Sequence, residues 1–330
     1  MDNTIVVSTP PHVKSKRTTR SIMLDVVISL LPCAIAGIVF FGWQALMIEL
    51  VAVVTCVATE FVYFFILNKG FSNKCADAKK VCVRWIKQFD LTSVITGLIL
   101  ALILPSTAKW YEVLIGAIFS IAVVKMLFGG TGKNLVNPAA AGRVFMFLSF
   151  SITTYVACNF GAVADGGTLT TGATNLSTLL GKNPSSTLNP LDLFLGSGVA
   201  GCIGETCKVA ILVGFVYLCV RNVIKWWQPL LFIVVFGFTA VFMSGFAFDS
   251  YKFDMTLFLP HILSGGVLFG AVFMFTDYST SPKGVYGQLV YYIAAALIVA
   301  ILRYLTKIEV TSFVIMLLNL IVPLIDKYLI

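Results

Sequence analysis

Apolar residues in this chain fall into long runs that are separated by shorter polar segments. A helix needs about 20 apolar residues to cross a hydrocarbon core of about 30 Å. Eight runs reach that length: 22–41, 45–67, 110–128, 139–157, 198–220, 229–246, 285–304 and 309–326. Two further runs, 91–105 and 260–276, are shorter and are bounded or interrupted by glycine and proline, so they predict short or broken helices. The pattern therefore predicts ten membrane-spanning helices.

Composition places the chain among polytopic membrane proteins. Hydrophobic residues make up 58% of the 330 positions, charged residues 12%, and the mean hydropathy is +0.95. These values exclude an ordinary soluble domain. The net charge of +8 does not require a nucleic-acid partner, because the basic residues cluster between apolar runs, where the positive-inside rule already accounts for them.

The charge distribution also predicts the orientation in the membrane. With ten spans and a cytoplasmic N-terminal tail, sixteen lysines and arginines fall on the inside, and five fall outside: Lys109, Lys182, Lys252, Arg303 and Lys307. We therefore expect both termini to be cytoplasmic and the segment 158–197 to lie on the outer side. The basic loop 69–87 could bind lipid headgroups or dock a cytoplasmic protein.

The two short runs are the third and the eighth, which are corresponding members if the chain is two sets of five. Thr96-Gly97-Leu98 in one resembles Ser264-Gly265-Gly266 in the other. Five spans is an odd number, so a duplicated second half would be inverted in the membrane. We expect an all-α polytopic membrane protein with ten transmembrane helices in two inverted five-helix repeats: 1–157 with the N-terminal tail, the outer loop 158–197, and 198–330.

The glycine-rich segment 129–138 is the first candidate binding site. It does not match a phosphate-binding Walker loop, because Leu127 stands at the first glycine position and Asn134 replaces the metal-binding hydroxyl. Gly130 would allow a close backbone approach, and the amides of Asn134 and Asn137 could bond the edge of a heterocycle. The alternative is a tight turn in which Pro138 starts the next helix.

Arg143 follows one turn later and has two open interpretations. It could bind a flavin or an acidic partner, or it could extend to the inner membrane surface. Among the acids in or near apolar runs, Glu205 lies three residues before Lys208, so it is either half of a buried ion pair or part of an ion path. Asp277 is the other candidate ion-path residue.

Other catalytic and metal-binding arrangements have no support in the sequence. Two histidines are too few for a metal cluster, and neither a hydrolase triad nor a His-Glu-x-x-His pattern occurs, so we expect no catalytic side chain and no metal site. The eight cysteines contain no Cys-x-x-Cys pair. They are expected to be reduced packing residues and not iron–sulfur ligands.

The polar outer loop contains Thr171-Gly172-Ala173-Thr174. A threonine hydroxyl can form a phosphoester with the ribityl phosphate of FMN, and Gly172 and Ala173 would let a modifying enzyme close over the backbone. On these residues alone, a simple turn remains the alternative.

Taken together, the chain resembles the NqrB/RnfD family, the flavin-carrying membrane subunits of the sodium-translocating NADH:quinone reductase and of the Rnf complex. The likeness covers nearly the whole chain. It rests on Pro11-His12, Thr96-Gly97, Leu104-Pro105, Gly129 to Asn134, Asn137-Pro138-Ala139, Gly142-Arg143, Thr171 to Thr174, Gly265-Gly266 and Thr276-Asp277. Its length favours the Rnf branch of the family. One departure is Thr168, which stands where the family commonly has an acid; the nearest acid is Asp165.

The resemblance implies FMN on Thr174, attached outside the cytoplasm by a flavin transferase. It also implies a second, non-covalent flavin, such as riboflavin, near the short third and eighth helices, for which Gly130, Asn134, Asn137 and Arg143 are candidates. The expected function is electron relay in the bacterial cytoplasmic membrane, within an ion-translocating ferredoxin:NAD+ oxidoreductase that moves Na+ or H+. Its partners would be membrane, flavoprotein and iron–sulfur subunits and membrane lipid.

A channel or secondary transporter with the same inverted repeat and no flavin is the rival hypothesis. The fold would suit both.

Overall fold

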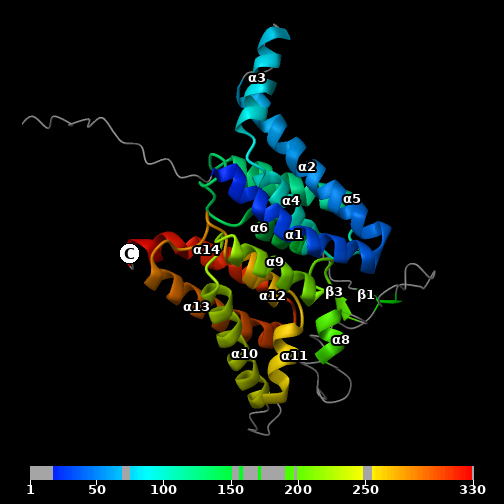
Figure 1. Cartoon of the computed structure of the whole chain (residues 1–330), viewed down its shortest axis with the longest axis vertical. Coiled ribbons are helices and arrows are strands. Elements are labelled where there is room, and N and C mark those ends of the chain that lie inside the picture. The colour runs from blue at the N-terminus through cyan, green and yellow to red at the C-terminus, as the bar shows by residue number, and fades with distance from the viewer. Residues whose placement is uncertain are drawn as a thin grey trace, which may run out of the picture.

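The computed structural model describes residues 18–68, 75–150, 156–158, 170–171, 190–196, 199–247 and 255–328 (Figure 1). In the N-terminal half, up to residue 150, all the regular elements among the described residues are helices. Its elements are α1 (Thr19–Phe41), α2 (Trp43–Leu67), α3 (Cys75–Gln88), α4 (Thr92–Leu102), α5 (Trp110–Ile118), the π-helix η1 (Phe119–Met126) and α6 (Pro138–Phe150).

The C-terminal half begins after a small sheet region. It contains α8 (Pro190–Leu195), β3 (Val199–Gly201), α9 (Lys208–Val220), α10 (Trp227–Ala247), the 3₁₀ turn η2 (Met255–Leu257), α11 (Phe258–Leu263), α12 (Val267–Phe269), the π-helix η3 (Gly270–Met274), α13 (Val285–Thr306) and α14 (Thr311–Tyr328). In Figure 1 the warm-coloured C-terminal helices pack beside the blue and green N-terminal ones.

Among the residues that the structure describes, five helices are long and apolar enough to cross a membrane: α1, α2, α10, α13 and α14. The number rises to seven if each of two bent helix pairs counts as one span. Many large apolar side chains on these helices are exposed, as lipid-facing residues would be; Ile35 and Val54 are 59% and 63% exposed. The molecule is thus an integral membrane protein, whereas ten spans in an inverted repeat remain a prediction.

Each of the ten apolar runs contains a helix, but two helices are shorter than their runs predicted. The helices α6 and α9 each span 13 residues. The run 198–220 was expected to be helical throughout, and this was wrong: its first residues form β3 and a turn, and α9 begins only at Lys208. Apolar residues mixed with Gly201 and Gly204 resemble a membrane span by hydropathy alone, although glycine disfavours a helix interior.

The structure is consistent with the predicted all-α membrane protein, and beside the helices the described residues form one small three-stranded sheet. β3 pairs antiparallel with β1 (Val156–Cys158), which pairs antiparallel with β2 (Thr170–Thr171). Val156 lies opposite both Thr171 and Gly201. The sheet brings the end of the N-terminal half to the start of the C-terminal half.

The two runs that were predicted to form short or broken helices do form such helices. The run 91–105 has its helix end at Leu102, and the backbone N–H groups of Ile203 and Gly204 donate to the carbonyls of Leu104 and Leu102 at 3.0 and 2.8 Å. The run 260–276 is interrupted between α11 and α12, where the helix direction changes by 69°. The bonds from Ile203 and Gly204 satisfy backbone carbonyls that a helix end leaves without partners.

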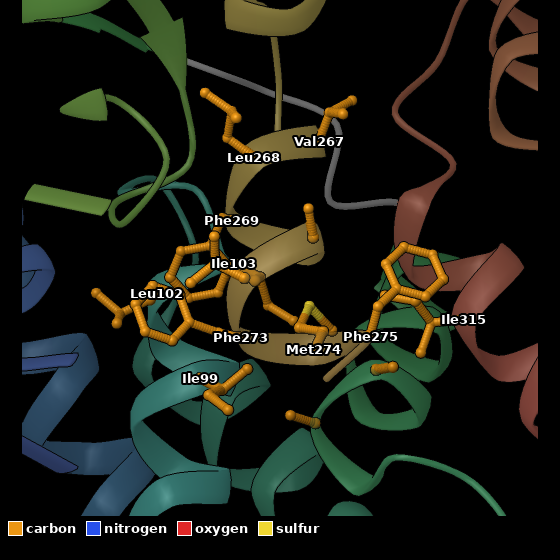
Figure 2. Close-up of a cluster of buried hydrophobic side chains, with 14 of the residues drawn as sticks. Ile99, Leu102, Ile103, Val267, Leu268, Phe269, Phe273, Met274, Phe275 and Ile315 are labelled. Atoms are coloured by element: carbon orange, nitrogen blue, oxygen red, sulfur yellow. The ribbon is translucent and has the colours of Figure 1, made fainter. Parts of the chain in front are cut away.

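Close helix packing surrounds the broken helices. A Cβ atom added at Gly97 of α4 would lie 2.8 Å from the Cα of Val53 in α2, so glycine is what permits this approach. Figure 2 shows part of the buried apolar cluster, in which Leu102 of α4 lies with Phe269 and Phe273 from the second broken helix. The core therefore lies where the two broken helices meet.

Candidate functional site

A cavity of about 450 Å³, named here the large cavity, lies between the two halves. Its walls come from α1, α4, η1, the connection before α6, the end of α9, and η3 with the loop after it. This volume falls within the range of about 300–1,000 Å³ that small-molecule sites occupy. Both π-helices contribute to the wall, η1 through Lys125 and η3 through Phe273, and π-helical turns are frequent at functional sites.

The lining of the large cavity is apolar in one part and polar in another. The apolar side chains are Met23, Val26, Ile95, Ile99, Pro138, Ala139, Leu218, Val223, Ile224, Val272 and Phe273. The hydroxyls and amides belong to Thr19, Thr92, Thr96, Thr131, Asn134, Asn137, Thr276, Tyr278 and Ser279. A planar heterocycle with apolar faces, polar edges and a hydroxylated tail matches such a lining.

Two of the predicted binding residues, Asn134 and Asn137, line the large cavity. The Oδ1 atom of Asn134 is buried and has no hydrogen-bond partner among the residues that the structure describes. Asn137 has a structural role. Its Oδ1 accepts from the backbone N–H groups of Ala139 and Ala140 at 3.0 and 3.3 Å and so caps α6. Asn134 is thus the better candidate for contacting a ligand.

The glycine-rich connection makes a tight turn beside the cavity. Gly130 has a φ of +87°, which favours glycine, and its N–H donates to the carbonyl of Lys125 at 3.1 Å. Gly130 does not line the large cavity, whereas its neighbours Thr131 and Gly132 do. Its position fits a role in shaping the turn.

Arg143 lies apart from Asn134 and Asn137. It is buried on α6 and lines a second, small cavity of about 30 Å³, together with Cys202, Glu205, Gly266 and Glu309. Of the four residues predicted to bind a non-covalent flavin, Asn134 and Asn137 therefore line one cavity and Arg143 lines another. Arg143 also does not extend to the membrane surface, because it is 7% exposed.

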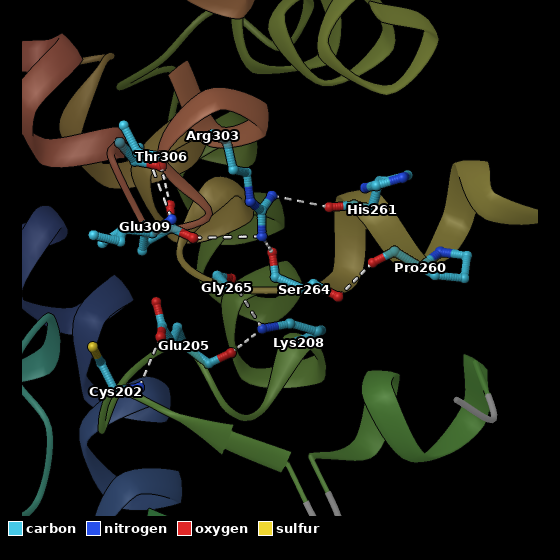
Figure 3. Close-up of polar contacts among 12 residues, drawn as sticks. Cys202, Glu205, Lys208, Pro260, His261, Ser264, Gly265, Arg303, Thr306 and Glu309 are labelled. Atoms are coloured by element: carbon cyan, nitrogen blue, oxygen red, sulfur yellow. Dashed lines mark hydrogen bonds and ion pairs between the residues drawn. The ribbon is translucent and has the colours of Figure 1, made fainter. Parts of the chain in front are cut away.

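The break between α11 and α12 is held by two buried cations (Figure 3). Arg303 donates to the carbonyls of His261 and Ser264 at 3.2 and 2.6 Å. Lys208 donates to the carbonyl of Gly265 at 3.4 Å and to that of Glu205. The charge distribution assigned Arg303 to an outer loop, but the structure places it inside α13, buried at this break.

The two predicted ion-path acids lie in different surroundings. One carboxylate oxygen of Glu205 accepts from the N–H of Cys202 at 2.7 Å, and the contact of Lys208 is with the Glu205 backbone, not its carboxylate. Asp277 lines the large cavity and accepts from the hydroxyls of Ser279 and Thr280 at 2.9 and 3.1 Å. The two acids therefore do not share one cavity.

The threonine motif lies mostly outside the described residues. Thr171 belongs to β2, whereas Gly172, Ala173 and Thr174 are not among the residues that the structure describes. The predicted FMN attachment at Thr174 therefore rests on the sequence.

Among the residues of the large cavity that sequence reasoning missed are Lys125 and Thr92. The signal was present, since a lysine inside the apolar run 110–128 is costly to bury and often marks a functional site. Thr92 donates its hydroxyl to Asp90 at 2.6 Å. Burial raises the pKa of Asp90, but hydrogen bonds from Thr92 and Thr131 outweigh that effect and hold this pKa below its ordinary value.

Comparison with known proteins places these features in a family. The model of the NQR2, RnfD, RnfE family matches residues 6–330. The chain is 37% identical to the D subunit of the Na+-translocating ferredoxin:NAD+ oxidoreductase complex of Acetobacterium woodii, over 98% of this chain and 93% of that protein.

Two further relatives are similar over nearly their whole length. The D subunit of the proton-translocating ferredoxin:NAD+ oxidoreductase complex of Clostridium ljungdahlii is 29% identical, over 99% of this chain and 95% of that protein. The D subunit of the ion-translocating oxidoreductase complex of Escherichia coli is 30% identical, over 98% and 96%. The family match and these relatives together show that the chain belongs to the NQR2, RnfD, RnfE family.

Proposed function

We propose that this chain is the flavin-carrying membrane subunit of an ion-translocating ferredoxin:NAD+ oxidoreductase complex. It relays electrons through FMN esterified to Thr174 and through a non-covalent flavin, such as riboflavin, in the large cavity. The complex moves Na+ or H+ outward, and its other members are membrane, flavoprotein and iron–sulfur subunits. The names of the relatives from Acetobacterium and Clostridium support this assignment.

The observation that carries the proposal is the large cavity itself. Its volume of about 450 Å³ and its division into apolar and hydroxyl-rich walls fit a three-ring heterocycle with a polyol tail. The buried Oδ1 of Asn134, which lacks a partner among the described residues, can accept a hydrogen bond from a ring N–H. When bound, a flavin supplies one-electron and two-electron transfer.

The covalent FMN depends on a maturation enzyme. A flavin transferase acting outside the cytoplasm would form the phosphoester at Thr174, with Thr171, Gly172 and Ala173 as the segment it recognises. The charge distribution of the loops supports the outer location.

The test separates the two flavins. Full-length chain made with its flavin transferase is run on a denaturing gel under ultraviolet light, and flavin released by acid is measured from a second sample. We expect a fluorescent band and released flavin from the natural protein, and only released flavin from Thr174→Ala. Thr170→Ala, which removes a neighbouring hydroxyl outside the tetrapeptide, serves as the control and should keep the band.

The rival hypothesis, a channel or secondary transporter without flavin, predicts a different result. It requires neither a fluorescent band nor acid-released flavin, with the transferase shown to be active on another substrate. That outcome would overturn the proposed function.

A further inference from the structure

Lys125 brings a charge to the large cavity inside the hydrophobic interior. Its side chain is 1% exposed, and it lines the cavity from the π-helix η1. A buried ammonium is costly unless every N–H finds an acceptor and an opposite charge is near. The surroundings of Lys125 must therefore compensate this cost.

Three acceptors fix the ammonium of Lys125. Its Nζ lies 3.3 Å from Oε2 of Glu60 on α2, and it donates to the hydroxyls of Thr92 and Ser93 on α4 at 2.6 and 2.9 Å. An ammonium has three donors, so these contacts use its full capacity. Lys125 is therefore a fixed charge that acts on the cavity through its field.

Lys125 and its counter-charge Glu60 differ in their position relative to the large cavity. Lys125 lines the large cavity, whereas Glu60 does not, and the Glu60 side chain is 13% exposed. The other charged side chains that line the cavity are Lys283, which is solvent-exposed, and Asp277, which is bonded to Ser279 and Thr280. Because charges away from water are screened little, Lys125 dominates the positive potential at its wall.

We propose that Lys125, moderated by Glu60, is a positioning residue that makes the large cavity bind a flavin more tightly in its reduced than in its oxidised form. The inference rests on the proposed function, since it concerns the same cavity. Reduction adds negative charge to a bound ring, and a preorganised cation favours the form with that charge. The flavin's reduction potential is thereby raised.

The test measures the potential and not the activity. Full-length Thr174→Ala protein, which retains only the non-covalent flavin, is titrated spectroelectrochemically with and without further changes. Lys125→Gln should lower the ratio of reduced-form to oxidised-form affinity about tenfold, which is about 59 mV for a one-electron step. Glu60→Gln should shift the potential in the opposite direction.

Two variants separate charge from structure. Lys125→Arg keeps the charge and should keep the potential near that of the natural residue. Lys133→Gln removes an exposed lysine from the neighbouring turn, does not line the cavity and should change nothing. If Lys125→Gln does not fold, Lys125→Arg and Glu60→Gln still decide the question.

The outcomes distinguish this inference from the proposed function. Bound flavin whose potential is unchanged in Lys125→Gln, or, should that variant not fold, in Glu60→Gln, would overturn the role of Lys125 and leave the cavity as a flavin site. Absence of acid-released flavin from the Thr174→Ala parent would overturn the proposed cavity function itself.

Discussion

Arg303 donates from Nη2 to the carbonyl oxygen of Ser264 at 2.6 Å, joining residues that are 39 positions apart. The second broken helix leaves backbone carbonyls without helical partners in the protein interior, where water is not available to bond them. The buried guanidinium, which also lies 3.4 Å from Glu309, supplies the missing donors. The break is therefore stabilised by a specific side chain, Arg303, from another helix.

Arg303→Gln should destabilise the protein strongly. The change leaves the carbonyls of His261 and Ser264 and the carboxylate of Glu309 without their cation, a loss of about 3–5 kcal/mol for a buried pair. Thermal unfolding of the detergent-purified chain measures it. Lys307→Gln, an exposed change just after the same helix, is the control, and an equal effect in both would contradict this role of Arg303.

Gly97→Ala should also destabilise, because the added methyl group would meet the α2 backbone at Val53. Overpacking of this kind costs about 1–3 kcal/mol. Gly287→Ala is the comparison, since the nearest atom there is a side-chain carbon of Ile325 at 3.1 Å, which can move. Unfolding midpoints that rank the two variants in the reverse order would show that the α2–α4 contact is not tight.

The two asparagines of the large cavity should differ in their effects. Asn134→Ala should weaken riboflavin binding about tenfold, the value of one good hydrogen bond, with little change in stability. Asn137→Ala should lower stability by about 1 kcal/mol through loss of the α6 cap. Equilibrium dialysis with riboflavin and thermal unfolding, applied to both variants, measure the two effects. Equal riboflavin affinity in natural protein and Asn134→Ala would remove Asn134 from the site.

We propose that Asp277 and Glu205 lie on the ion path, so neutralising either acid should reduce ion uptake. Asp277→Asn and Glu205→Gln are compared in membrane vesicles that hold the whole complex, with ferredoxin oxidation as the driving reaction. Uptake is measured relative to the electron flux, so that slower electron transfer is not mistaken for lost coupling. A variant with an unchanged ratio excludes its residue from the path.

Much of the helical pattern was predictable because membrane spans require long apolar runs. The end of α4 before Pro105 and the break at 264–266 were visible as glycine and proline in or beside short runs. The β3 strand was not predictable, since hydropathy does not distinguish a buried strand from a membrane-spanning helix.

The candidate site was predictable only in part, because sequence neighbours can face opposite directions. Arg143 lies six residues after Asn137, which is about 240° around an α-helix. The two therefore line different cavities. The partners of Lys125 could not be predicted for another reason: only the folded chain brings Glu60, Thr92 and Ser93 to its ammonium.

The backbone bonds from Ile203 and Gly204 to the end of α4 have a mechanical consequence. A transporter that alternates access by rocking one half against the other would have to break them in every cycle. Electron tunnelling has the opposite requirement, because its rate falls steeply when donor and acceptor move apart. Hydrogen bonds that join the two halves at their centre therefore fit the proposed electron relay better than alternating access.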